Sequence, residues 1–257
     1  MIAVRDLLKN QKVNVNYVTV EGYSALHWAS MSGHAEVIDI LVAAGARVDY
    51  ARPKDGTTAL FAASHAGHLK AVSSLIRANA DPNQVMTDEL GFSPLMIAAF
   101  YGHALVVDAL LAADARVDYA SPKDGTTAQH LASQEGHLQT VSSLIRAGAD
   151  PNQVTTGELA FSPLMIAAAN GHALVIDAFL AAGARVNYAR PKDGFTALFA
   201  ASQAGQLQAV RSLLLAGADP RLAAHDGTTA LDAAKRNKHI AIVALLEARL
   251  AELAASP

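Results

Sequence analysis

The chain has 257 residues, of which 52% are hydrophobic and 17% are charged, and its formal net charge is −3. These values allow a buried core, argue against extensive disorder and give no basic footprint for nucleic acid or anionic membranes. The absence of cysteine excludes disulfides, thiolate nucleophiles and cysteine-based zinc sites. No stretch is apolar enough to span a membrane, and the first residues lack a signal-peptide pattern, so we expect a cytoplasmic protein.

A short pattern recurs along the chain: a glycine, once an alanine, lies two residues before serine or threonine. The anchors of this pattern are Gly22, Gly56, Gly91, Gly125, Ala160, Gly194 and Gly227. They are 33 to 35 residues apart, and each unit continues roughly as G-x-[ST]-[AP]-L-x-x-A-[AS]-x-x-G-H before a second apolar stretch. A period of this length is typical of stacked repeats, each of which buries its apolar stripe only against its neighbours.

Within each repeat the pattern predicts two short helices. In chain order, residues 1–20 are expected to form a partial capping repeat, residues 21–226 six repeats, and residues 227–257 a capping repeat with an extended last helix. In the second of the six repeats the helices are Ala59–His65 and Leu69–Arg77, because apolar residues recur there at i, i+3 and i+4. The two end segments are expected to give the stack more polar outer surfaces.

The expected helix ends carry their usual signals. Serine or threonine precedes each first helix as an N-cap, and Pro94 and Pro163 take the first helical position. Each second helix up to the sixth repeat is followed by a residue that tolerates the left-handed conformation. These residues are Gly45, Asn79, Asp114, Gly148, Gly183 and Gly217.

The repeats resemble the ankyrin repeat over nearly the whole chain. Ser24–His34 reads SALHWASMSGH, and Ser93–His103 and Ser162–His172 keep the proline of that family's T-P-L-H-x-A-A-x-x-G-H signature. Ala147–Asn152 matches the family's G-A-D-x-N close. The resemblance implies an all-α ankyrin-repeat solenoid of stacked helix-turn-helix units with β-hairpin-like finger loops, in one domain over residues 1–257.

Three residues stand out against this pattern. Gln129 replaces an inward leucine in the fourth repeat, and we expect it to be a buried amide without partners that weakens its repeat. Lys238 replaces a glycine in the seventh repeat. Trp28 lies at an inward position of the first helix, and we expect it to belong to the core.

A second period of 69 residues groups the repeats in pairs. Phe92–Asp124 and Phe161–Asp193 are identical at 26 of 33 positions, which core packing alone does not require. We interpret this as duplication of a two-repeat block or as deliberate design. Loops that follow the odd repeats carry lysine and proline, as in Tyr50–Asp55, whereas those after the second and fourth repeats carry acidic residues and no lysine.

A column of histidines recurs at the repeat spacing. Its members are His34, His68, His103, His137, His172 and, after Gln206, His239. Stacked helices lie about 10 Å apart and Zn–N bonds are about 2.0–2.1 Å long, so two of these histidines cannot share an ion. The resemblance implies that each histidine holds its own turn by hydrogen bonds, and we expect no metal and no cofactor.

The sequence offers little support for catalysis. It contains no G-x-S-x-G, H-E-x-x-H, P-loop or G-x-G-x-x-G motif. A triad assembled in space remains open, but an active site needs unique residues and this chain repeats its residues. We expect the protein not to be an enzyme.

The resemblance implies that a partner meets the concave face, which is formed by the finger loops and the outer side of each first helix. By the motif, the exposed positions are the residue after the anchor glycine and the two residues before the G-H pair. The candidates are Tyr23, Met31, His65, Phe92, Phe100, Tyr101, Gln134, Glu135, Phe161, Asn170, Phe195 and Gln203. Phe100 and Tyr101 become Ala169 and Asn170 in the fifth repeat, and exposed aromatics mark interfaces; the alternative is that Phe100 is core.

We therefore expect a monomeric protein-binding module whose partner is a protein, with no nucleic acid and no membrane involved. Two alternatives stay open. One is a designed or purely structural scaffold without a natural partner, and the irregular residues Gln129 and Asn79 argue against design. The other is an inhibitor that fills a partner enzyme's active site with its finger loops, although no repeat carries a long insertion.

Overall fold

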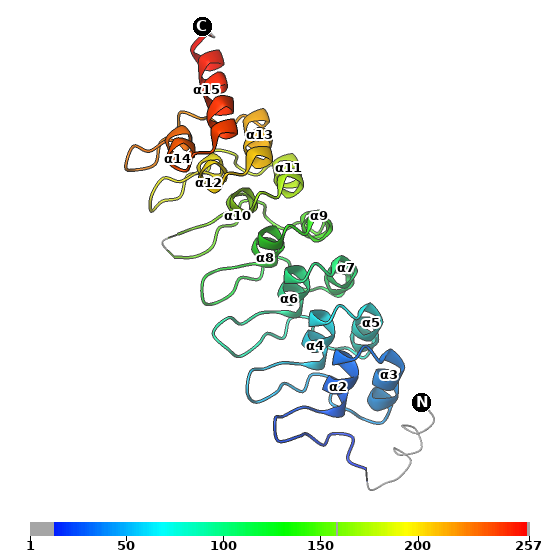
Figure 1. Ribbon diagram of the computed structural model, residues 1–257. Helices are drawn as coiled ribbons and strands as arrows, with labels where there is room; N and C mark the ends of the chain where they lie inside the picture. Colours follow the sequence, from blue (N-terminus) through cyan, green and yellow to red (C-terminus); the bar gives the residue numbers. More distant parts are fainter. Residues whose placement is uncertain (1–12, 158, 256–257) are drawn as a thin grey trace. The chain divides into compact units, whose positions relative to one another are not determined.

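The computed structural model describes residues 13–157 and 159–255 and divides into two compact units, the first ending at Lys123 and the second beginning at Asp124 (Figure 1). The helices of the first unit are α2 (Ala25–Met31), α3 (Ala35–Ala43), α4 (Ala59–His65), α5 (Leu69–Arg77), α6 (Pro94–Phe100) and α7 (Ala104–Ala112). Those of the second are α8 (Ala128–Glu135), α9 (Leu138–Arg146), α10 (Pro163–Asn170), α11 (Ala173–Ala181), α12 (Ala197–Ala204), α13 (Leu207–Leu215), α14 (Ala230–Arg236) and α15 (Ile240–Ala255). Residues 1–12 of the expected N-terminal capping repeat, which spans residues 1–20, lie outside the described residues.

Within each unit the helices form two layers. The first helices of successive repeats pack against one another, as α2, α4 and α6 do, and the second helices pack in a separate layer behind them. The core lies between the layers, where Leu60, Leu75 and Leu95 are almost fully buried. In each unit the finger loops project on the side of the first helices (Figure 1).

The helix ends form as their sequence predicts. The Ser93 side chain accepts a hydrogen bond from the Met96 amide at 3.2 Å, and Pro94 follows at the first helical position. After the second helices, Asn79 and Asp114 both have φ of +61°, in the same left-handed region as the glycines at the corresponding positions. The N-caps and the left-handed ends are thus confirmed.

The finger loops, which connect each second helix to the next first helix, are hairpin-like but form no strand within the described residues. Their isolated antiparallel bridges are Val18–Ser24 and Ala223–Thr229. Single backbone hydrogen bonds close other fingers: the Met86 amide donates to the Phe92 carbonyl at 3.0 Å, and the Thr155 amide to the Phe161 carbonyl at 2.9 Å. Each such bond fixes the base of a finger next to the first helix that follows.

The histidine column joins neighbouring repeats. Nε2 of His68 donates to the Met31 carbonyl and Nε2 of His239 to the Gln203 carbonyl, both at 3.1 Å. The prediction that each histidine holds its own turn is therefore wrong, because the acceptor belongs to the repeat before. The last carbonyls of a first helix have no partner within that helix, so a donor from the next repeat satisfies them.

Within each unit, the glycine before a column residue leaves room for the column residue of the repeat that follows. A Cβ atom added to Gly205, whose φ is +77°, would lie 2.6 Å from Cε1 of the His239 ring. Lys238 holds the same left-handed conformation, with φ of +61°. No repeat follows α15 within the described part of the chain, so no ring covers Lys238 and a side chain is accommodated there.

Gln129 is buried, with 1% of its surface exposed. Its Nε2 donates to the Asp150 carbonyl at 3.3 Å, while its Oε1 has no partner among residues 13–157 and 159–255. The prediction of an amide without partners is thus wrong for the nitrogen and right for the oxygen. The finger loop beside Gln129 supplies the acceptor, which a pattern within one helix does not reveal.

Substitutions at two glycines of the second unit distinguish the cost of backbone strain from the cost of a steric clash with the next repeat. Gly205→Ala and Gly217→Ala both force alanine into the left-handed region, which costs about 1–2 kcal/mol. We expect Gly205→Ala to lose about 1–3 kcal/mol more, because its Cβ meets His239 while nothing lies within 4 Å of Gly217. Urea unfolding of both variants measures the difference, and equal losses would refute the role given to the ring.

Gln129→Leu restores the residue found at the corresponding positions, such as Leu95 and Leu164. We expect the free energy of unfolding in urea to rise by about 1 kcal/mol, because a buried acceptor without a partner costs about 1–3 kcal/mol. A fall would show that the hydrogen bond to Asp150 outweighs the unsatisfied oxygen. Leu164→Gln is the matched control, and it should destabilise the fifth repeat.

Candidate partner-binding face

In the first unit the candidate residues lie at the ends of the first helices and at the bases of the fingers. Met31, His65 and Tyr101 are exposed at the C-terminal ends of α2, α4 and α6. Phe92 and Phe100 are half-buried. Phe100 is therefore neither fully exposed nor core.

A pocket of about 280 Å³ lies between α2 and α4, and we call it the Tyr23 pocket. It is lined by Tyr23, Met31, Arg52, Thr57, Phe61, Ala62, His65 and Ala66. Three of the candidates chosen from the motif, Tyr23, Met31 and His65, thus line one cavity. They come from two successive repeats, which the stacking of α2 on α4 brings together.

Arg52 is a pocket residue that the motif does not indicate. Its guanidinium lies 3.8 Å from the centre of the Tyr23 ring and donates through Nε and Nη2 to the Glu21 carbonyl. Its Nη1 lies 3.0 Å from Oδ2 of Asp55. Burial alone would raise the pKa of Asp55, but hydrogen bonds from Thr57 and the charge of Arg52 hold that pKa below its usual value. The sequence signal is the RPKD loop, whose arginine repeats at Arg190 but not at Ser121.

A second feature, the ring cluster, is formed by His65, Phe100, Tyr101 and His103. The Tyr101 ring lies 4.7 Å from the His65 ring, 5.0 Å from the Phe100 ring and 6.1 Å from the His103 ring, measured between ring centres. These distances fall in the range of attractive aromatic pairs. Because His65 belongs to both features, the ring cluster adjoins the Tyr23 pocket across α4.

In the second unit the helix-end candidates are polar and the finger-base candidates aromatic. Those exposed at the ends of α8, α10 and α12 are Gln134, Glu135, Asn170 and Gln203. Phe161 and Phe195 are half-buried at finger bases, and the Arg190 guanidinium lies 4.4 Å and 5.2 Å from their ring centres. Phe195 also stacks on the buried Phe199 at 4.0 Å, so its ring is largely committed to packing.

The histidine column fixes the backbone beneath several candidates. The accepting carbonyls belong to Met31, His65, Gln134 and Gln203, each paired with Nε2 of a column histidine at 3.0–3.1 Å. Those side chains are exposed while their main chain is held by the next repeat. The face therefore combines a fixed backbone with variable side chains.

Trp28 is exposed over half of its surface, so the prediction that it belongs to the core is wrong. Its ring lies 5.0 Å from that of Tyr23. The corresponding residues Ala62 and Ile97 are buried within the stack. No helix precedes α2 among the described residues, which leaves Trp28 uncovered.

Two buried histidines attach first helices to fingers. Nε2 of His27 donates to the Thr57 carbonyl at 2.9 Å, and Nε2 of His130 to the Phe161 carbonyl at 3.1 Å. Nδ1 of His130 accepts from the Thr127 amide at 3.1 Å, so the ring is neutral. Burial lowers the pKa of His27 and lowers that of His130 to about 4, although the hydrogen bonds to the carbonyls oppose the shift.

Within the described residues no three histidine, aspartate or glutamate side chains gather as a metal site would require. None of the helices in the same part of the chain is both long and apolar enough to cross a membrane.

Helix pairs stacked in two layers, with finger loops on one side and donors that link successive pairs within each unit, define a helical repeat protein. The family model described as "Ankyrin repeats (3 copies)" matches residues 2–86, 83–155, 130–224 and 164–253. The chain belongs to the ankyrin-repeat family. Ankyrin repeats are protein-interaction modules, and the fold is typically not enzymatic.

Known proteins of several kinds share these repeats. The solved ankyrin repeat domain of human ASB11 matches with a TM-score of 0.75 and 25% identity, covering 88% of this chain and 98% of that one. The ankyrin repeat and KH domain-containing protein mask-1 of Caenorhabditis elegans is 35% identical over 153 residues, which are 60% of this chain and 6% of that protein. The human transient receptor potential cation channel subfamily A member 1 is 28% identical over 215 residues. The chain spans only 6–19% of the length of these two curated relatives.

The buried His130 makes stability depend on pH. Between pH 6.5 and about 4 the unfolded chain binds a proton that the folded chain does not, so the free energy of unfolding falls as the pH decreases through this window. From pH 7.5 to 5 we expect His130 to contribute a loss of about 2 kcal/mol, since one pKa unit corresponds to about 1.4 kcal/mol.

The control is His130→Met, because methionine occupies the corresponding positions 96 and 165. Urea unfolding of this variant should lose about 2 kcal/mol less than the parent over the same pH change. The same pH dependence in both proteins would show that His130 does not titrate as described.

Proposed function

We propose that this chain binds a partner protein through the face of the first unit that contains the Tyr23 pocket and the ring cluster. The observation that carries the proposal is the convergence of rings from separate repeats: Tyr101, directly after α6, contacts His65 of α4, and His65 lines the pocket. Aromatic residues make up only 5% of the chain, so their concentration on one face is not a property of the whole sequence.

The chemistry of this face suits recognition of an apolar side chain. Met31 and Tyr101 expose 40% and 45% of their surfaces beside the pocket, and aromatic residues dominate binding hot spots. Arg52 and Asp55 hold each other in place, and the side chains of His68 and His103 donate to the carbonyls at the ends of α2 and α4. A face fixed in this way loses little conformational entropy on binding, which favours affinity.

We propose the second-unit candidates as further, mainly polar contacts. Gln134, Glu135, Asn170 and Gln203 are exposed on the second unit and can exchange hydrogen bonds with a partner that binds that unit. We assign no catalytic role to the chain, and its net charge of −3 supports a protein partner over nucleic acid.

Phe100→Ala with Tyr101→Asn tests the proposal, because it copies the residues of the fifth repeat and should fold. Removing a hot-spot aromatic costs at least about 2 kcal/mol of binding, which is roughly thirtyfold in affinity. Proteins captured by the parent chain from the source cells are identified by mass spectrometry, and the affinity of each purified partner is then measured by calorimetry for both chains.

The control variant is Leu105→Ala, which removes an exposed leucine from α7, in the layer of second helices. It should bind as the parent does. If the double variant folds and also binds every partner as tightly as the parent, the face is wrongly assigned. If the double variant unfolds, the rings serve the core and the assignment equally fails.

A further inference from the structure

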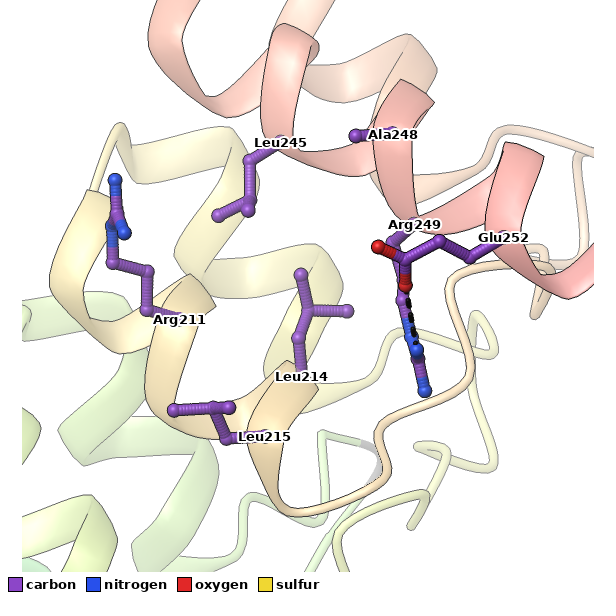
Figure 2. Close-up of a pocket in the computed structure, with 7 residues that line it drawn as sticks. All are labelled: Arg211, Leu214, Leu215, Leu245, Ala248, Arg249 and Glu252. Atoms are coloured by element: carbon purple, nitrogen blue, oxygen red, sulfur yellow. Dashed lines mark hydrogen bonds and ion pairs between the residues drawn. The ribbon is translucent and has the colours of Figure 1, made fainter.

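The second unit has a groove between α13 and α15, in the layer of second helices and away from the finger loops (Figure 2). It is lined by Arg211, Leu214, Leu215, Leu245, Ala248, Arg249 and Glu252 and has a volume of about 350 Å³. Leu214 is buried, whereas Leu215 exposes 90% of its surface. The groove thus has an apolar centre between charged ends, and it shares no residue with the face proposed above.

The duplicated sequence shows that the fold does not require this groove. The corresponding helices α5 and α9 end in VSSLIR, whereas α13 ends in VRSLLL. Arg77 and Arg146, the counterparts of Leu215, donate to serine hydroxyls of their own helices at 2.9 Å. Compared with α5 and α9, α13 therefore differs at two polar positions, with Arg211 in place of serine and Leu215 in place of arginine.

The helix α15 completes the groove. It has 16 residues, whereas α13 has nine, and its later turns supply Ala248, Arg249 and Glu252. Arg249 Nη1 pairs with Glu252 Oε2 at 2.8 Å, so the carboxylate is neutralised within its own helix (Figure 2). Arg211 forms no hydrogen bond or ion pair with any of the described residues, and it leaves the groove with an uncompensated positive charge.

We propose that this groove binds an amphipathic helix of a partner protein that carries an acidic residue. An apolar groove beside a helix is the usual seat for the apolar face of a partner helix. The leucine-type side chains of the partner helix lie on Leu214, Leu215 and Leu245, where they shield the exposed Leu215 from water. The charge selects the partner, because the free Arg211 guanidinium recognises a carboxylate at the edge of the groove.

The experiment uses a phage-displayed library of amphipathic helices with constant leucines and randomised polar positions, selected on the whole chain. We expect enrichment of sequences with aspartate or glutamate beside the leucine stripe. The enriched peptide is synthesised, and its affinity is measured by fluorescence anisotropy for the parent and for Arg211→Ser with Leu215→Arg. That pair of residues occurs naturally in α5 and α9, so the variant should fold, and we expect it to bind at least tenfold more weakly.

Three further variants separate the possible outcomes. Leu174→Ala, an exposed leucine of α11, and Phe100→Ala with Tyr101→Asn should leave the affinity unchanged, which makes this result independent of the face proposed above. Arg211→Ser alone should bind the acidic peptide more weakly than the parent does. It should not prefer a peptide in which lysine replaces the acidic residue.

The proposal is overturned if no helix is enriched, if enriched helices lack an acidic residue, or if the double variant at Arg211 and Leu215 binds equally well. It is also overturned if sedimentation shows that the chain pairs with itself and that this variant abolishes the pairing, since the occupant is then a second copy.

Discussion

The stack depends on one hydrogen bond that is repeated along each unit. A histidine that opens a second helix donates from Nε2 to the carbonyl at the end of the preceding first helix, at 3.0–3.1 Å. Gln206 makes the same contact through its amide, to the Ala169 carbonyl at 3.3 Å. The bond satisfies a carbonyl that the short helix leaves unpaired, and it sets the spacing at which the apolar faces of neighbouring repeats meet.

This bond also decides where the molecule can vary. The histidine ring packs against the glycine that follows the accepting helix, so a side chain at that glycine would displace the ring. The residue whose carbonyl accepts this bond is constrained in the opposite way. Its main chain is fixed, but its side chain is exposed and can vary. Met31, His65 and Gln134 occupy such positions with unrelated chemistry, which is how one scaffold presents different surfaces.

Much of the fold could be predicted from the sequence, because its signals are local. Caps such as Ser93, the proline after it, and left-handed ends such as Asn79 each act within a few residues. The errors concern contacts beyond a single helix. The acceptors of the histidines and the exposure of Trp28 depend on the neighbouring repeat, and the bond from Gln129 to Asp150 depends on the finger loop of the same repeat. No pattern within one helix contains that information.

The candidate face follows the same division. The motif identified Tyr23, Met31 and His65, which the structure brings into one pocket. Tyr23 follows the anchor glycine and the other two lie before the G-H pair, and both kinds of position are fixed by the first helix they flank or end. It missed Arg52, which reaches Tyr23 from a loop about 30 residues later. It also missed the groove beside α13, whose walls come from helices of different repeats. Contacts that long side chains make between repeats are the hardest feature to predict from such a sequence.

The 69-residue period has a consequence for how such a chain changes length. Each repeat contacts only its neighbours, and within each unit the joints of the column follow one rule, a ring or amide packed against a glycine. Unequal recombination that removed Phe92–Ala160 would join Gly91 to Phe161 and recreate the reading GFSPLM. The shortened sequence would keep its repeat period unbroken at the new joint, so one recombination event can add or remove two repeats without shifting the register of the pattern.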